Sequence, residues 1–509
     1  MALTLTLALA HTTPAAPAAA PSFTIENDEF VRDGKVAHLR AGCVHYSRVP
    51  AEYWEDRLLR LKAMGLNAIQ TYVPWNWHEP VRGEFNWEGD RDLGQFLATA
   101  QKVGLLVVLR AGPYMCGEWC AHSVSRSSCS RSGGGAKMHA AGAGSSAACR
   151  PGSSPTDRSR SAPTPSPTSA TSTATGRRSC CRCSRSTSTP RAATSSWCPP
   201  PPLLSSPPAH PFASLQVQCE NEYGSYGDVS KHPTDKQYML HLISTAREVL
   251  GEDVILFTTD GGDEGFMTRG SINGSMVYTV GDGCGSPQTC VDAQKAFNPP
   301  GKSPFMCSEC YTGWLTHWGE AGANTSSSAP HVDSILGKFG GSVSLYMGHG
   351  GTNWGFWSGA NGGGGTSFQP HITSYDYDSP VSEAGEHGYN NGLDKYAAMQ
   401  TVLKKYASKD EVVPPEPPLL PRTAYGQMAM TQRAGLLANL AVLSPEAAAT
   451  NTDATPFAES LGPACHYGFM VYSTKLSAPE AAPGSQLTIT AGGLRDRAQV
   501  GAATAGLDP

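Results

Sequence analysis

The sequence predicts an α/β protein, a (β/α)8 TIM barrel followed by a truncated all-β domain. Three observations predict this fold. Strand and helix patterns alternate between residues 53 and 110, as in a parallel sheet with crossover helices. Glu222 and Glu309 each follow a short apolar run, and the strand ends of such a barrel carry active-site groups. Behind a proline-rich linker, residues 408–509 hold short Ala- and Thr-rich segments that suit small strands.

The elements of the first half follow from local patterns. Residues 23–50 have the pattern of short strands and turns. Apolar residues recur at helical spacing over 53–64 and over 92–103, and a glycine follows each segment, where a left-handed residue commonly ends a helix. A strand is predicted at 66–73 and another at 105–110, where a nearly continuous apolar run fits a strand buried on both faces.

Sequence patterns typical of a folded domain occur again from residue 217 to residue 407. A helix is predicted over 237–249 and a strand over 254–259. A loop at the end of a late strand is predicted at 373–378, and a closing helix over 389–406. The barrel is therefore expected in two parts, residues 23–119 and residues 217–407.

Residues 120–216, between these two parts, have a different composition. They consist mainly of Ser, Arg, Pro, Ala, Gly and Thr with almost no aliphatic periodicity, and they contain seven of the 15 cysteines. A disordered insertion is the simple interpretation. A structureless loop of this length inside a compact barrel is unusual, however, and argues that the segment is anomalous.

Composition excludes several classes of protein. The formal net charge is −5 and 16% of the residues are charged, so neither a nucleic acid nor a polybasic membrane surface is expected as a partner. No apolar run approaches the roughly 18 residues of a membrane-spanning helix. Residues 1–20 resemble a secretory signal peptide, although they lack a basic start. The Asn-X-Ser/Thr triplets at Asn273 and Asn324 fit a secreted glycoprotein.

The cysteines outside residues 120–216 indicate neither a disulfide scaffold nor a zinc site. Cys284 and Cys290 are close enough in sequence to close a small surface loop. Cys43, Cys116 and Cys219 fit free buried thiols. No spacing is that of a zinc site, and no cofactor is expected.

Aromatic residues surround the carboxylates at the predicted strand ends. The strand at 66–73 runs into residues 74–80 with two tryptophans, and the strand at 105–110 runs into residues 112–119 with Glu118 between aromatics. The C–H faces of a sugar stack on such rings while its hydroxyls bond to carboxylates and amides. Two glutamates in this setting are what a glycosidase needs, although a single solvated glutamate or core tryptophan would have a purely structural meaning.

Several long motifs resemble glycoside hydrolase family 35, the retaining β-galactosidases. They include HYSRVPAEYWEDRLLRLKAMGLNAIQTYVPWNWHEP, GLLVVLRAGPYMCGEW, VQCENEYGSYG, SECYTGWLTHWGE, LYMGHGGTNWGFWSGAN and SYDYDSPVSEAGE. The resemblance covers roughly residues 23–119 and 217–407. The later strings YGFMVYST and LRDRAQV resemble pieces of the first β-domain of the family.

The resemblance implies a role for ten residues. Glu222, after the asparagine, aligns with the acid/base and Glu309 with the nucleophile. The residues that would line a galactose pocket are Tyr72, Cys116, Gly117, Glu118, Asn221, Trp314, Tyr346 and Tyr377. The implied substrate is a carbohydrate with a terminal β-galactose, and the implied location is extracellular, vacuolar or lysosomal.

The implied mechanism is a double displacement. Glu309 attacks the anomeric carbon while Glu222 protonates the leaving oxygen, and water activated by Glu222 then releases galactose with the β configuration retained. This predicts carboxyl groups about 5–5.5 Å apart and environments that push the two pKa values apart. The alternatives are a relative of the exo-β-glucosaminidases, a non-catalytic carbohydrate binder and an inactive product of mis-splicing.

Two family motifs are missing from residues 120–216. A Gly-Gly-Leu-Pro-x-Trp segment is expected after Trp119, and an Arg-Gly-Gly-Pro-x-Ile segment before the acid/base strand. Codons for residues 145–154, shifted by two bases, permit Phe-Gly-Gly-Leu-Pro-Ala-Trp-Leu-Leu. The same shift permits Asp-Val-Asp-Arg-Tyr-Trp at 170–176 and Arg-Gly-His-Val-Ile-Met at 191–197.

The shifted codons suggest that part of this segment is read in the wrong frame. Residues 120–144 and 198–216 are interpreted as translated introns and residues 145–197 as an out-of-frame exon. The lost exon is expected to supply a strand and a helix, and a barrel without them would have unpaired edges.

Overall fold

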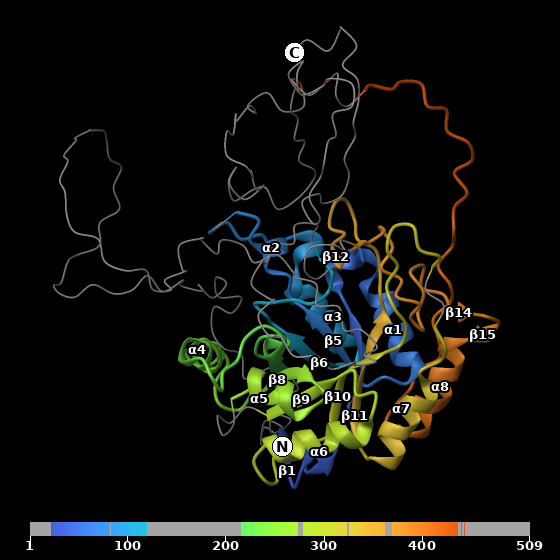
Figure 1. Ribbon diagram of the computed structural model, residues 1–509. Coiled ribbons are helices and arrows are strands. Elements are labelled where there is room, and N and C mark those ends of the chain that lie inside the picture. Colours follow the sequence, from blue (N-terminus) through green and yellow to red (C-terminus); the bar gives the residue numbers. More distant parts are fainter. Residues whose placement is uncertain are drawn as a thin grey trace, which may run out of the picture.

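Eight parallel strands form a closed barrel (Figure 1). They follow the order of the chain, and the last strand pairs with the first. Their bounds are β4 (Arg40–Val44), β5 (Ala68–Tyr72), β6 (Leu106–Arg110), β7 (Leu215–Gln218), β8 (Ile255–Gly261), β9 (Tyr278–Asp282), β10 (Met306–Tyr311) and β11 (Ser342–His349). This arrangement confirms the predicted (β/α)8 barrel.

The computed structural model describes residues 22–81, 83–119, 215–272, 278–322, 325–361, 369–435, 439 and 442. The predicted signal segment 1–20, the triplet 273–275, Asn324 of the second triplet and residues 120–214 lie outside these ranges. Within them, no helix is long and apolar enough to cross a membrane.

The predicted loss of a barrel strand is wrong. β6 pairs directly with β7 over Val107–Arg110 and Leu215–Gln218, so all eight positions of the barrel are filled. β7 also begins at Leu215, two residues inside the segment 120–216 that composition separates from the barrel. The two strands that flank the anomalous segment are therefore direct neighbours in the barrel.

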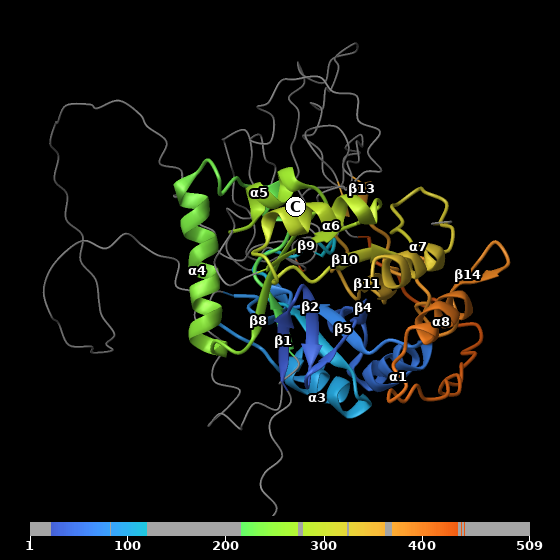
Figure 2. The ribbon, with the colours of Figure 1, turned by 90° about the horizontal axis from the view of Figure 1, so that it is seen from below.

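Helices surround the barrel, as the view from below shows (Figure 2). Their bounds are α1 (Trp54–Met64), α3 (Leu93–Val103), α4 (Pro233–Leu250), α5 (Glu264–Gly270), α6 (Pro287–Phe297), α7 (Ala329–Asp333) and α8 (Lys395–Lys405). Gly65 and Gly104 end α1 and α3 with φ of 107° and 80°, as predicted. α4 is longer than the predicted 237–249 because Pro233 supplies a favourable first helical residue.

The predicted helix over 389–406 is correct only from residue 395. Residues 389–394 instead form a hairpin of β14 (Tyr389–Asn390) and β15 (Leu393–Asp394). Asn391 and Gly392 have φ of 49° and 77°, and Asn-Gly favours such a two-residue turn. Asp394 then starts α8, because its side chain accepts a hydrogen bond from the Ala397 N–H at 2.8 Å.

The two ends of the barrel differ. An antiparallel sheet of β1 (Phe23–Glu26), β2 (Glu29–Arg32) and β3 (Lys35–Val36) covers the lower end, where Phe30 packs on Tyr278 (Figures 1 and 2). The upper end carries the short helix α2 (Trp75–His78) and the strand pair β12 (Ala360–Asn361) and β13 (Gln369–Pro370). The strand C-termini open at this upper end, so the loops there can build a site.

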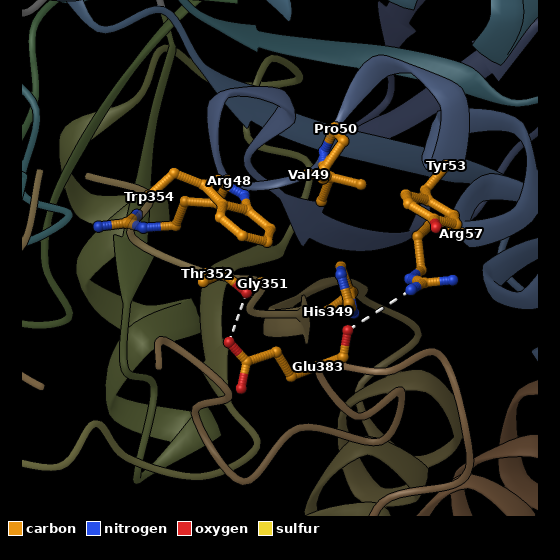
Figure 3. A pocket seen from close by; sticks show the side chains of 10 residues that line it. All are labelled: Arg48, Val49, Pro50, Tyr53, Arg57, His349, Gly351, Thr352, Trp354 and Glu383. Carbon is orange, nitrogen blue, oxygen red and sulfur yellow. Dashed lines mark hydrogen bonds between the residues drawn. The ribbon is translucent and has the colours of Figure 1, made fainter. Parts of the chain in front are cut away.

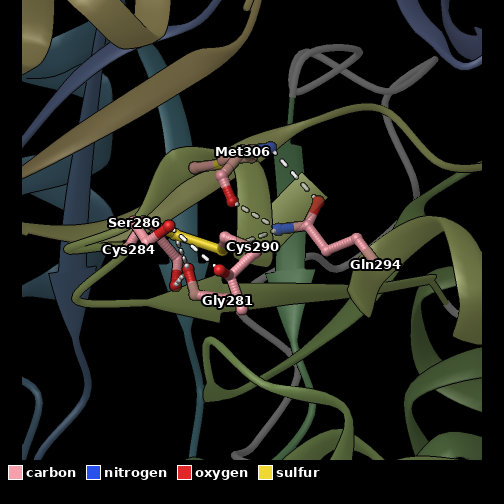
Figure 4. Close-up of a disulfide and its surroundings, with 8 residues drawn as sticks. Gly281, Cys284, Ser286, Cys290, Gln294 and Met306 are labelled. Carbon is pink, nitrogen blue, oxygen red and sulfur yellow. Dashed lines mark hydrogen bonds between the residues drawn. A yellow bond between two sulfur atoms is a disulfide. The ribbon is translucent and has the colours of Figure 1, made fainter. Parts of the chain in front are cut away.

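A disulfide ties α6 to the loop after β9 (Figure 4). Cys284 and Cys290 form the predicted pair and close a small surface loop: the two cysteines are 3% and 0% exposed, while Gly285, Ser286, Gln288 and Thr289 between them are exposed. The Gln294 side chain, one turn further along α6, donates a hydrogen bond to the Met306 carbonyl of β10 at 2.9 Å. Through α6, these two contacts connect the end of β9 to the start of β10.

The linker after α8 packs back on the barrel. Arg60 of α1 forms an ion pair with Glu416 at 3.1 Å and donates to the Pro418 carbonyl at 2.7 Å. Residues 411–435 form neither helix nor strand. The all-β fragment expected within 408–509 falls largely on residues 443–509, outside the described ranges, and stays a prediction.

Candidate active site

Glu222 and Glu309 lie at the upper rim of the barrel. Glu309 belongs to β10, and Glu222 comes four residues after the end of β7. β8 and β9 separate these two strands, so the glutamates approach one another across the mouth of the barrel. The charge of Glu309 acts on the Glu222 carboxyl, which means that the two groups share one electrostatic environment.

Donors surround the Glu309 carboxylate. Oε1 forms an ion pair with Arg110 at 2.5 Å and accepts a hydrogen bond from the Tyr72 hydroxyl at 3.4 Å. Oε2 accepts one from the Tyr311 hydroxyl at 3.1 Å. Glu309 is 4% exposed and Arg110 is 0% exposed. This environment suits an ionised carboxylate held in a fixed orientation, which is what a nucleophile needs.

The environment of Glu222 favours its protonated form. Burial, and next the negative charge of Glu309, raise the pKa of Glu222 above the ordinary value. Its carboxyl group also contacts the side chains of Asp282 and Cys116, and the Asn221 amide donates to Oε2 at 3.4 Å. A glutamate that keeps its proton beside an ion-paired glutamate is equipped to act as a general acid.

Arg110 connects the two halves of the site. Besides pairing with Glu309, its guanidinium donates to the Asn221 side-chain oxygen and lies over the Tyr72 ring at 4.0 Å. Gln218 donates to the same Asn221 oxygen at 2.8 Å. The amide orientation of Asn221 is thereby set, with its NH2 group towards Glu222.

A further carboxylate, Glu118, lies in the loop after β6. It is 6% exposed, and its Oε2 accepts a hydrogen bond from the Tyr375 hydroxyl at 2.5 Å. Gly117 precedes it, and an added Cβ there would lie 2.6 Å from the terminal methyl group of Met115, which would have to shift. The Cys116 carbonyl accepts a hydrogen bond from Tyr346 at 3.3 Å.

Aromatic rings form the remaining wall. The Tyr377 ring lies 5.3 Å from Tyr346, 5.4 Å from Tyr375 and 5.8 Å from Trp314. The Trp314 ring also meets Tyr311, which donates to Glu309. The candidate residues inferred from the sequence thus occur in one connected set of contacts around the two glutamates.

Backbone strain gathers at this rim. Five non-glycine residues have left-handed φ between 45° and 61° here, and they are Glu118, Glu220, Glu222, Tyr377 and Asp378. Such conformations cost free energy and persist where the surrounding structure holds them, often at functional sites. The strain turns the chain sharply after β7 and aims Glu222 into the mouth of the barrel.

The sequence does not single out four residues of this site, Arg110, Tyr311, Tyr375 and Asp282. Arg110 ends an apolar strand, where a buried arginine is a signal of an unusual partner. Tyr375 and Tyr377 are two positions apart in the SYDYD string. Their side chains would point the same way only if this loop were extended. Asp282 ends a five-residue strand that contains a glycine and has a weak strand signal.

A separate pocket of about 170 Å³ lies beside the loops after β4 and β11 (Figure 3). The residues that line it include Tyr53, Arg57, His349, Trp354 and Glu383. Its acidic group is already engaged, because the Glu383 carboxylate accepts hydrogen bonds from Thr352 and Ser374. Neither Glu222 nor Glu309 lines this pocket, so it is distinct from the carboxylate site.

Known proteins are similar to this chain. Its sequence matches glycosyl hydrolases family 35 over residues 29–122 and 214–406, more than half of the chain, and leaves 123–213 unmatched. β-Galactosidase 17 of Arabidopsis thaliana is 37% identical over 506 residues, which cover 97% of this chain and 63% of that protein. β-Galactosidase of Homo sapiens is 35% identical over 481 residues, which cover 93% and 60%.

β-Galactosidase 8 of Oryza sativa subsp. japonica is 36% identical over 508 residues, which cover 98% of this chain and 66% of that protein. The chain therefore spans about three-fifths to two-thirds of the length of these relatives. The family match extends over both parts of the barrel and includes every residue of the carboxylate site. The chain belongs to glycosyl hydrolases family 35.

Proposed function

We propose that the protein is a retaining exo-β-galactosidase, which hydrolyses terminal non-reducing β-galactose from oligosaccharides, polysaccharides or glycoconjugates. The observation that carries this proposal is the opposite environment of two neighbouring glutamates. Glu309 is ion-paired with Arg110, whereas burial and Glu309 raise the pKa of Glu222. Relatives named β-galactosidase, 35–37% identical to this chain, support the choice of sugar.

In the first displacement, Glu309 attacks the anomeric carbon and forms a glycosyl ester. Glu222 gives its proton to the leaving oxygen as the glycosidic bond breaks. Arg110 and the Tyr72 and Tyr311 hydroxyls hold Glu309 for this attack, because they fix both carboxylate oxygens. The Asn221 amide, oriented by Arg110, faces the same side as Glu222 and would bond a sugar hydroxyl.

In the second displacement, Glu222 takes a proton from water and the resulting hydroxide oxygen attacks the anomeric carbon. The ester bond to Glu309 breaks, and β-galactose leaves. Glu118, Tyr346 and Tyr377 would bind the remaining hydroxyls and the ring face, since they belong to the set of contacts that surrounds the glutamates. The Cys284–Cys290 disulfide supports an oxidising location, such as the secretory route to an extracellular, vacuolar or lysosomal site.

The experiment is a substrate panel with the 509-residue chain. 4-Nitrophenyl β-galactoside is compared with the α-galactoside and with the β-glucosaminide, and proton NMR follows the anomer that is released first. Hydrolysis of the β-galactoside with initial release of the β-anomer is expected. Preference for the β-glucosaminide would overturn the choice of sugar, and initial release of the α-anomer would overturn the retaining mechanism.

A further inference from the structure

Another buried carboxyl group lies between Glu222 and Glu309. Asp282 is the last residue of β9, and it is 9% exposed. Its neighbours in the barrel are β8, where it lies opposite Gly261, and β10, which carries Glu309. The N–H of the next residue, Gly283, donates to the Glu309 carbonyl at 2.9 Å. This bond ties the backbone of the β9 end to the nucleophile.

The acid/base glutamate reaches Asp282 from the other side. The Glu222 N–H donates to the Thr259 carbonyl of β8 at 2.8 Å, which holds the turn after β7 against the strand beside β9. The side chains of Asp282 and Glu222 are hydrogen-bonded to each other. Two carboxyl groups can form such a bond only if one of them carries a proton.

Asp282 is the better holder of that proton. Its Oδ2 atom is buried, and no N–H or O–H donor among the described residues reaches it. Burial raises the pKa of Asp282 well above its ordinary value, and the charges of Glu222, Glu309 and Asp260 raise it further. Arg110, the cation of the site, is already paired with Glu309.

Other titratable groups face this carboxyl pair from the surrounding strands. They are Cys116 after β6, Arg110 of β6, Tyr72 of β5, Asp260 of β8, and Cys307, Glu309 and Tyr311 of β10. The carboxyl groups among them oppose ionisation of Asp282. Arg110 acts on Glu222 instead, and lowers the pKa of that group.

We propose that Asp282 stays a neutral carboxylic acid and acts as the positioning residue of the acid/base, donating its O–H to one oxygen of Glu222. This proposal rests on the proposed function. The proton of Asp282 does not move during turnover. In the first step Glu222 loses its own proton to the leaving oxygen, and the Asp282 O–H stabilises the carboxylate that forms. In the second step the same bond aims the free Glu222 oxygen at water.

Two variants of Asp282 separate a donor from a merely structural residue. Asp282→Asn keeps the shape and supplies an amide N–H donor, whereas Asp282→Leu keeps a similar shape with no donor. Loss of the donor destabilises the Glu222 carboxylate, so the pKa of Glu222 rises. The alkaline limb of kcat/KM reports this group. In Asp282→Leu the limb should therefore move up by about one pH unit, as expected for one hydrogen bond to a charged group.

The Asn variant is expected to keep the alkaline limb of the wild type within a few tenths of a pH unit, and the Leu variant to lose about tenfold in kcat. Glu383→Gln is the matched control, because it removes a carboxylate at the same rim that contacts Thr352 and Ser374 instead of the glutamates. An unmoved or lowered limb in Asp282→Leu, or equal shifts in the two variants, would overturn the proposal.

A measurement without turnover separates this proposal from the function. Infrared difference spectra between Asp282→Asn and the wild type at pH 7 should show the loss of one buried protonated carboxyl band. A chain that cleaves no galactoside but shows this band would overturn the function and keep the neutral Asp282. A chain that cleaves galactosides but lacks the band would keep the proposed function and overturn the neutral Asp282.

Discussion

Arg110 and Glu309 meet across the full width of the barrel. They stand on β6 and β10, which lie four positions apart in a ring of eight strands, yet their charged groups are 2.5 Å apart. Neither side chain is exposed by more than 5%. Arg110 therefore takes the place of water beside the Glu309 carboxylate, and breaking the pair would leave a buried charge without a partner.

Arg110→Met should destabilise the fold and stop catalysis. It leaves the buried Glu309 carboxylate without its cation, which commonly costs about 3–5 kcal/mol. Urea unfolding at neutral pH measures the loss. Lys102→Met is the control, because its pair with Glu55 is exposed and should contribute less than about 1 kcal/mol. Equal losses in the two variants would contradict a buried, mutually dependent pair.

Glu309→Gln should abolish turnover and keep sugar binding. The amide fits the same space and its single oxygen can still accept a hydrogen bond from one of the two tyrosines, but it cannot form the glycosyl ester. A fall in kcat on the order of 10⁴-fold is expected, with galactose affinity by calorimetry changed by less than about tenfold. A variant with the kcat of the wild type would show that another group is the nucleophile.

Tyr375→Phe should weaken substrate binding. The hydroxyl donates to the Glu118 carboxylate, and its loss frees that carboxylate to turn away from the sugar. A rise in KM of about tenfold is expected, as for one hydrogen bond to a charged group. Tyr396→Phe removes a hydroxyl that donates to the Arg60 carbonyl outside the barrel, and its kinetics should match the wild type. A Tyr375 variant with unchanged KM would remove Glu118 from the pocket.

Asp260→Asn should make folding less dependent on pH. Asp260 accepts hydrogen bonds from the Gly224 N–H at 2.8 Å and the Ser271 hydroxyl at 2.9 Å, and burial raises its pKa from 3.8 to about 8. Because the folded state holds this proton more tightly, the stabilisation is complete below pH 3.8 and is lost as the pH rises through about 8.

The size of this effect follows from the proton affinity. At about 1.4 kcal/mol per pKa unit, the rise in the pKa of Asp260 corresponds to a stabilisation of at most roughly 6 kcal/mol. The difference in unfolding free energy between Asp260→Asn and the wild type should grow in favour of the variant from pH 4 to pH 8. Asp292→Asn, on the exposed face of α6, controls for the change of net charge. A difference that stays constant with pH would show that Asp260 is ionised throughout.

The mature transcript across codons 115–225 should differ from the printed chain. We infer that residues 120–144 and 198–216 are translated introns and that 145–197 is an exon in the wrong frame. The family match supports this inference, because it stops at residue 122 and resumes at 214. Sequencing should find Trp119 joined to Glu-Phe-Gly-Gly-Leu-Pro and Met-Val joined to Gln218. A transcript that encodes the chain as printed would contradict it.

Local sequence patterns predict the elements of this fold well where they indicate only one kind of secondary structure. Regular apolar spacing with a closing glycine locates α1 and α3 to within about a residue. The β14–β15 hairpin is missed because the helical pattern after it is extended backwards over an Asn-Gly turn. The short strand β9 has no alternating pattern, because its five residues are all buried and include Gly281.

The sequence predicts the site residues that belong to a recognisable motif. It does not predict the residues whose role depends on contacts with other side chains. The two glutamates and the tyrosine wall come from long strings with a family resemblance. Arg110, Asp282 and Tyr375 owe their importance to partners distant in the sequence, namely Glu309, Glu222 and Glu118. Only the closed barrel brings these pairs together, so spacing along the chain contains no sign of them.

The barrel divides into two arcs with two seams. Residues 22–119 contribute β4, β5 and β6, residues 215–349 contribute β7 to β11, and the arcs join at β6–β7 and β11–β4. Arg110 belongs to one arc and Glu309 to the other. The Glu309 carboxylate is therefore paired with its cation only after both seams have closed. Enzymatic turnover would therefore require the closed ring of eight strands. In a chain with either seam open, the Glu309 carboxylate would lack the Arg110 cation.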